Sequence, residues 1–67
     1  MALERTSRRI LARLKREGRV LEKAEGSHHK MREPASRRII IVPHPKKDLP
    51  VGTARNIARS AGWLEVE

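Results

Sequence analysis

A pair of histidines beside a glycine turn is the feature of this sequence best suited to chemistry. The run Gly26-Ser27-His28-His29 puts two imidazoles directly after residues that favour a turn. Histidine gains and loses a proton near neutral pH, so one histidine among cations is a minimal device for cleaving a phosphodiester. The other interpretation of this segment is an ordinary surface histidine, or one that contacts phosphate without chemistry.

Alternation of side chains along a strand separates the two histidines. If a strand starts at His28, then His29 and Met31 share one face. His28, Lys30 and Arg32 then share the other. Met31 marks the covered face, so we expect His29 to be partly buried and His28 to stand among cations on an open face. There it would deprotonate a 2′-hydroxyl or protonate a leaving 5′-oxygen, and the cations would stabilise the negative charge on the phosphorane.

The third histidine lies between two prolines, in the run Pro43-His44-Pro45. We expect His44 to shape its loop or to bind a phosphate, and it is the only other candidate for proton transfer. Adjacent strand residues His28 and His29 point apart, and no carboxylate cluster accompanies them. We therefore expect neither a metal site nor a cofactor.

The net charge of the chain indicates which class of molecule it binds. The chain has 16 Lys and Arg against 8 Asp and Glu, which gives a formal net charge of +8. Because this excess is spread along the chain, it favours a nucleic acid over an anionic membrane, and an acidic protein is the third possibility. With one Trp and no Phe or Tyr, a surface that stacks bases is not expected.

Length and composition predict one small domain over residues 1–67. The sequence contains no cysteine and no apolar run long enough to cross a bilayer or to act as a signal core. We therefore expect a cytoplasmic protein without a membrane anchor.

Two amphipathic helices are predicted near the ends of the chain. Apolar residues at helical spacing place the first over 7–17, and Gly18 ends it. We expect Thr6 or Ser7 to supply the capping oxygen at its start. A narrow stripe of small apolar residues places the second helix over about 50–61.

Three strands are predicted between these helices, over 19–24, 28–33 and 37–42. The last contains three consecutive Ile and a Val, which predicts a central or well-covered position in the sheet. The order α-β-β-β-α indicates an α+β domain in which two helices cover one face of an antiparallel meander. We expect Trp63, just after the second helix, to fold back onto the core.

Three separated motifs then resemble a known family. They are Gly26-Ser27-His28-His29, the run 41–50 followed by Gly52-Thr53, and Ala61-Gly62-Trp63. Together they are similar to the HicA family, the toxins of HicA–HicB toxin–antitoxin modules, over about residues 5–63. The resemblance implies a fold like that of double-stranded-RNA-binding domains, ribonuclease activity on mRNA, growth arrest, and neutralisation by a HicB antitoxin.

The resemblance also implies that His28 is the catalytic histidine, because the family's histidine follows the Gly-Ser pair. Our leading hypothesis is a metal-independent endoribonuclease toxin. We expect the turn to shape the approach of RNA, strand cations to hold the scissile phosphate, and the basic first helix with the proline-rich loop to contact flanking phosphates. The expected RNA-binding residues are Gly26, Ser27, Lys30, Arg32, His44, Lys46 and Lys47.

Four residues depart from the family's common pattern. Arg19 and Met31 stand where aromatic residues are frequent, Glu25 where Lys is frequent, and Ala54 where a larger aliphatic residue is usual. We expect these changes to thin the core and to remove a cation near the site.

Two further hypotheses belong to other functional classes. The chain could be a catalytically inactive RNA-binding module, or a degenerate toxin acting mainly through its antitoxin. It could also be an interaction subunit whose basic face serves only an acidic protein. An assay of RNA cleavage distinguishes the inactive RNA-binding module from an enzyme. A measurement of RNA affinity of the free chain distinguishes the interaction subunit from both.

Overall fold

The helices form where apolar residues recur at helical spacing. The computed structural model of the chain describes residues 3–64. Helix α1 (Ser7–Arg16) buries Ile10, Leu11 and Leu14, and the chain leaves it through Gly18 at a φ of +94°. Helix α2 (Val51–Ser60) buries a narrower stripe of small residues, as predicted. Among the described residues, neither helix combines the length and the hydrophobicity that crossing a membrane requires.

The start of α1 differs from the prediction, because neither hydroxyl caps the helix. The Thr6 Oγ1 donates to the Lys47 carbonyl at 3.2 Å. The Ser7 Oγ accepts from the Lys46 N–H at 2.8 Å, and the Ser7 N–H donates to the Lys46 carbonyl at 2.8 Å. Both hydroxyls therefore fasten the start of α1 to the loop that precedes α2.

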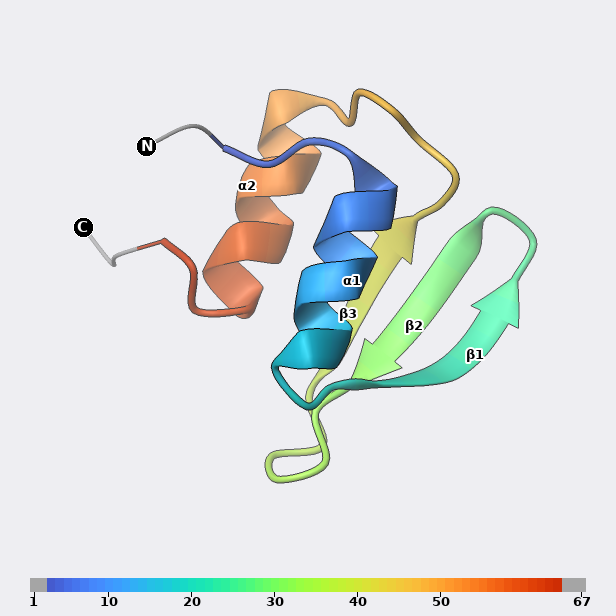
Figure 1. Cartoon of the computed structure of the whole chain (residues 1–67), viewed down its shortest axis with the longest axis vertical. Helices are drawn as coiled ribbons and strands as arrows, with labels where there is room; N and C mark the ends of the chain where they lie inside the picture. Colours follow the sequence, from blue (N-terminus) through green and yellow to red (C-terminus); the bar gives the residue numbers. More distant parts are fainter. Residues whose placement is uncertain (1–2, 65–67) are drawn as a thin grey trace.

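The three strands form one antiparallel sheet in the order β1-β2-β3 (Figure 1). Their bounds are β1 (Val20–Glu25), β2 (His28–Arg32) and β3 (Ile39–Pro43). Both helices lie on the same side of this sheet (Figure 1). The α-β-β-β-α order and the antiparallel meander are confirmed, which makes the chain an α+β protein.

The core lies between the helices and the face of the sheet that carries Met31. Met31 and Val42 are completely buried there, and Leu49 from the loop before α2 closes the end of the same cluster. Trp63 packs back against this cluster, as expected. The buried residues of the cluster are Ile10, Leu11, Leu14, Met31, Ile40, Val42, Leu49, Ala54 and Ile57.

The predicted central position of the isoleucine-rich strand is wrong, because β3 is an edge strand. Only Ile40 and Val42 turn toward the helices, while Ile39 and Ile41 stay exposed on the opposite face. A continuous apolar run is typical of strands covered on both faces, but here the helices cover only one. Two large apolar side chains are thus left on the uncovered face.

Candidate active site

The Gly26-Ser27 turn sets the start of β2. The turn spans two residues, since Glu25 and His28 are direct partners across the β1–β2 pair. Gly26 has a φ of +56°, whereas Ser27 is not among the described residues with a positive φ. This pattern fits a type II′ hairpin turn. A side chain at Gly26 would meet nothing within 4 Å, so the backbone conformation and not lack of space favours glycine here.

The uncovered face of the sheet carries the residues predicted for the chemistry. His28 is the exposed first residue of β2, and no side-chain hydrogen bond involves it in the described part of the chain. Lys30 and Arg32 follow on the same face, half-buried opposite Ile41 and Ile39 of β3. The predicted grouping of one histidine with two cations is therefore present on one face of one strand.

The two cations differ in their availability to an anion. The Arg32 Nε lies 3.3 Å from the Glu22 Oε1, so part of its charge is balanced within the sheet. Lys30 forms no ion pair with any residue in the range 3–64. Lys30 is therefore the freer of the two for a phosphate.

From the sequence, Glu25 was expected only to remove a cation near the site. Glu25 is the direct cross-strand partner of His28, so it brings a carboxylate to the same face. Its Oε2 lies 3.3 Å from the Lys23 Nζ. The two-residue turn could have revealed this, because such a turn always pairs the residues on either side of it.

The other two histidines form a separate cluster on the helix-covered side. The rings of His29 and His44 meet edge to face, with their centroids 4.7 Å apart. The His44 Nδ1 lies 2.8 Å from the Oγ of Ser7, which is completely buried. We name this group the Ser7–His44–His29 cluster, and it agrees with the expectation that His29 is partly buried.

The hydrogen bonds of Ser7 indicate which ring nitrogen of a neutral His44 accepts. The Ser7 Oγ already accepts from the Lys46 N–H at 2.8 Å. Within residues 3–64, His44 Nδ1 is then the one acceptor available to the hydroxyl proton. A buried hydroxyl without an acceptor is costly, so we assign the Oγ–H as donor and Nδ1 as acceptor, which leaves the ring hydrogen on Nε2.

The predicted RNA-binding residues thus divide between two places. His28, Lys30 and Arg32 lie on the uncovered face, and the turn leads into them. His44 belongs to the Ser7–His44–His29 cluster, while Lys46 and Lys47 are exposed beside the start of α1. Residues 3–64 contain no group of three or more His, Asp or Glu side chains arranged to hold a metal ion.

Comparison with known protein families agrees with this architecture. The family described as the HicA toxin of bacterial toxin–antitoxin systems matches residues 7–63. The chain belongs to the HicA toxin family. A HicA-family chain is a toxin of a toxin–antitoxin system, and the family implies a HicB-like antitoxin as its partner. A search of curated proteins found no match to this sequence.

The departures of this HicA-family chain have structural explanations. Arg19 is buried, with its side chain 8% exposed, and bonds to Glu17 at 2.9 Å and Glu33 at 3.0 Å. Its Nη2 also donates to the Ala61 carbonyl at 3.2 Å, so this arginine joins the ends of both helices to the end of β2. Arg19 therefore replaces apolar packing with a network of charged hydrogen bonds.

The other departures in this HicA toxin are accommodated in the core and on the surface. Met31 is fully buried, and Ala54 is buried on the face of α2 that meets the core. Glu25 is exposed at the end of β1.

Proposed function

We propose that this HicA toxin is a metal-independent endoribonuclease that cleaves mRNA in the cytoplasm, with His28 as its proton-transfer group. The observation that carries the proposal is the contrast among the three histidines. His29 and His44 are held by each other and by Ser7, whereas His28 is exposed and keeps both ring nitrogens for a substrate.

The proposed reaction is an attack of the RNA's own 2′-oxygen on the adjacent phosphorus. Neutral His28 takes the 2′-hydroxyl proton, the 2′-oxygen–phosphorus bond forms, and the bond to the 5′-oxygen breaks. The leaving 5′-oxygen takes a proton from water, and His28 gives its proton back to the solvent. The products are a 2′,3′-cyclic phosphate and a 5′-hydroxyl. Lys30 and the free edge of the Arg32 guanidinium stabilise the negative charge that builds on the phosphate oxygens.

Flanking phosphates are the proposed ligands of Lys46 and Lys47. These lysines follow β3 and lie beside the start of α1, so an RNA strand that reaches them from His28 passes round the end of the sheet at His44. Contacts of this kind fix the position of the RNA without reading its bases. The Gly26-Ser27 turn borders the same path and leaves room for the sugar-phosphate backbone.

The test is cleavage of a long RNA by the whole chain in excess chelator. Wild type is expected to cleave and to leave 2′,3′-cyclic phosphate ends, and His28→Ala is expected to lose about 100- to 10,000-fold of the rate. Equal cleavage by both proteins, or a requirement for added metal, contradicts the proposal. Loss in His44→Ala instead, with the fold retained, would move the reaction to the helix-covered side.

A binding module without catalysis is the second candidate, and one observation favours it. Glu22 balances part of the Arg32 charge, and Glu25 brings a further carboxylate beside His28. Both reduce the positive potential at the proposed site. This candidate predicts salt-sensitive RNA binding, no cleavage, and no growth arrest when the chain is expressed.

A further inference from the structure

The two outer edges of the sheet differ in how open they are to another strand. In β1 the register with β2 shifts between Leu21 and Lys23, and half of its six residues are charged. Bulges and charges are the usual means by which proteins block an exposed sheet edge. In β3 the register with β2 is regular and all five residues are apolar. The β3 edge therefore lacks the protection that the β1 edge has.

Backbone hydrogen bonds at the two ends of β3 decide which of its groups face outward. The Glu33 N–H donates to the Arg38 carbonyl at 2.8 Å, and the His44 N–H donates to the Ser27 carbonyl at 2.8 Å. In an antiparallel pair, hydrogen-bonded and non-hydrogen-bonded positions alternate. The even-numbered residues of β3 therefore bond to β2, and the odd-numbered residues point their backbone groups away from it.

Ile39 and Ile41 are the residues whose backbone groups point outward. Each has one N–H and one C=O directed past the edge, and no hydrogen bond to these groups occurs within residues 3–64. Their side chains are 41% and 49% exposed. Pro43, the next odd-numbered residue, has a carbonyl but no N–H, so the outward N–H donors of β3 end at Ile41. The edge thus offers two donors, two acceptors and an apolar surface.

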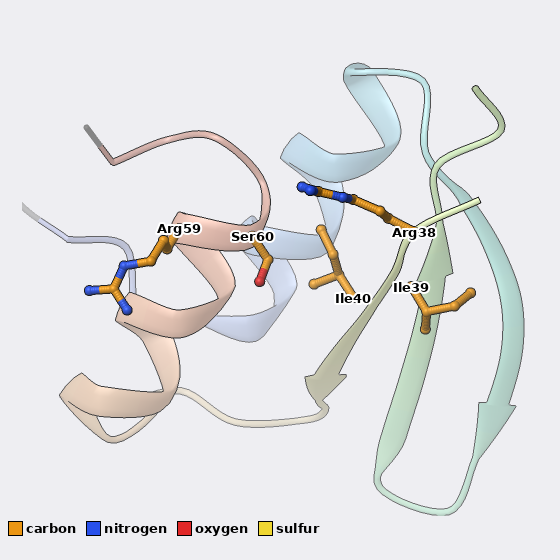
Figure 2. Close-up of a pocket in the computed structure, with 5 residues that line it drawn as sticks. All are labelled: Arg38, Ile39, Ile40, Arg59 and Ser60. Atoms are coloured by element: carbon orange, nitrogen blue, oxygen red, sulfur yellow. The ribbon is translucent and has the colours of Figure 1, made fainter. Parts of the chain in front are cut away.

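An open pocket continues this edge toward α2. It has a volume of about 440 Å³ and lies between the first residues of β3 and the last turn of α2 (Figure 2). Arg38 and Arg59 both line it; the Arg38 side chain extends from the strand toward the helices, whereas the Arg59 side chain points away from β3 (Figure 2). Neither guanidinium forms an ion pair in the described part of the chain, and Arg59 only reaches the Asn56 Oδ1 at 3.5 Å. The strand side of the pocket therefore carries the positive charge of Arg38, which no acidic side chain within residues 3–64 balances.

We propose that the β3 edge binds an extended acidic segment of a partner protein, which adds to the sheet as a fourth strand. The segment's backbone pairs with Ile39 and Ile41, and an acidic side chain enters the pocket toward Arg38. Strand addition takes its affinity from main-chain hydrogen bonds and its specificity from side-chain pockets. This goes beyond the ribonuclease proposal, because none of these three residues takes part in cleavage.

Charge identifies the class of partner. A second copy of the chain also carries a net charge of +8, so two β3 edges would bring like charges together. RNA has the right charge but no backbone N–H and C=O groups spaced to match a strand. An acidic polypeptide satisfies both the outward backbone groups and the charge of Arg38. Membership of the HicA toxin family implies a protein partner, the antitoxin.

The test uses a blocked ten-residue peptide in which Val and Glu alternate, titrated into the isotope-labelled full chain by NMR. The amides of residues 39 and 41 are expected to shift and to exchange more slowly with solvent. Ile41→Pro removes one outward N–H without touching the β2–β3 bonds, which an edge strand tolerates. It is expected to weaken peptide binding about tenfold, since it deletes one pairing hydrogen bond.

Matched controls separate strand pairing from simple charge attraction. Ile41→Thr keeps the outward N–H and should stay within about threefold of wild type, since threonine also suits a strand. A peptide of equal charge with Pro in place of Val cannot form a strand and should not bind at the edge. The variant Arg38→Gln should weaken binding of the first peptide, because it removes the complementary charge.

Several outcomes overturn the proposal. These are equal binding of the proline peptide, shifts that map to β1 or α1, or an unchanged affinity in a folded Ile41→Pro variant. Dimerisation of wild type without peptide, lost in Ile41→Pro, would assign the edge to a second copy and also overturn it. RNA cleavage by wild type is measured separately, so its absence counts against the ribonuclease proposal and leaves the peptide result intact.

Discussion

The two faces of β2 give adjacent histidines opposite environments. His28 is exposed on the face that no helix covers. His29, one residue later, is half-buried on the covered face, where its ring packs against His44, and His44 in turn bonds to Ser7. The difference teaches that one residue type at consecutive positions can serve packing on one side of a strand and stay free for a ligand on the other.

The same comparison extends along the strand. Met31 on the covered face is completely buried, whereas Lys30 and Arg32 on the uncovered face are only half-buried and charged. Removing a side chain from the covered face should therefore cost stability, and removing one from the uncovered face should cost ligand binding or reaction rate. The following predictions test that division.

The largest effect is expected for the two histidines themselves. His28→Ala should lower the rate of RNA cleavage by about 100- to 10,000-fold, because it removes the proton-transfer group. Its free energy of unfolding should change by no more than about 0.5 kcal/mol, as for other surface substitutions. His29→Ala should show the reverse pattern, with lower stability and a smaller loss of rate. Cleavage assays and chemical denaturation on both variants check this. Equal losses of rate and stability in the two variants would contradict the different roles assigned to His28 and His29.

The core side of the strand is tested by Met31→Ala. Deleting a fully buried side chain should cost about 2–5 kcal/mol, from lost burial and the cavity left behind. In a domain of 67 residues such a loss is a large part of the total stability. The neighbour Lys30→Ala is the matched control and should stay within about 0.5 kcal/mol of wild type. Urea unfolding followed by Trp63 fluorescence measures both, and comparable losses would contradict the division of faces.

The Ser7–His44–His29 cluster is tested by Ser7→Ala. This change leaves the Lys46 N–H and the His44 Nδ1 without their buried partner, which should cost about 1–3 kcal/mol. Ser60→Ala, on the exposed end of α2, is the control and should be near neutral. Thermal unfolding of the two variants gives the comparison. If Ser7→Ala unfolds like wild type, the cluster does not contribute to stability.

Salt dependence tells which face contacts RNA. If Lys30 contacts one phosphate, Lys30→Gln should reduce the slope of log affinity against log salt by about 0.7, the value for one contact to a single strand. Lys15→Gln removes an exposed charge from α1, on the opposite side of the sheet. It should change the slope less. Equal changes in filter-binding titrations would mean that RNA contacts both sides.

The smallest effect is expected from acid. Burial raises the pKa of Glu17, but hydrogen bonds from Trp63, Arg13 and Arg19 outweigh it, so the pKa lies below its ordinary value of 4.5. The folded state therefore favours the ionised form, and the resulting stability is lost as the pH falls below about 4.5 through the lowered pKa. Glu17→Gln should flatten this part of the profile of melting temperature against pH. A wild-type profile as flat as the variant's would contradict the assignment.

Local patterns predicted much of the fold. The helical spacing of Ile10, Leu11 and Leu14 fixed the face of α1 that is buried, and the alternation around Met31 fixed which face of β2 the helices cover. The candidate site was predictable to the same degree, because a two-residue turn at Gly26 sets the phase of the strand that follows it. These features depend on neighbours in sequence.

Features that depend on distant partners were predicted less well. Ser7 was expected to cap its own helix, but its hydroxyl bonds to His44, 37 residues away. The isoleucine run was expected in a central or well-covered strand, but residues 3–64 contain no fourth strand to cover the outer edge of β3. Arg19 was expected to thin the core, and the sequence did not reveal that its guanidinium nitrogens bond to Glu17 and Glu33 while its buried Nε has no partner within residues 3–64.

The sequence by itself determined the order of the elements, the turn at Gly26 and the separation of His28 from His29, since each follows from backbone preference and side-chain alternation within a few residues. Only the tertiary structure decided that His44 joins His29 and Ser7, that Glu22 balances part of the charge of Arg32, and that β3 has an open edge. Those contacts arise when segments far apart in sequence meet. The pattern of any one segment carries no record of which partner it will meet.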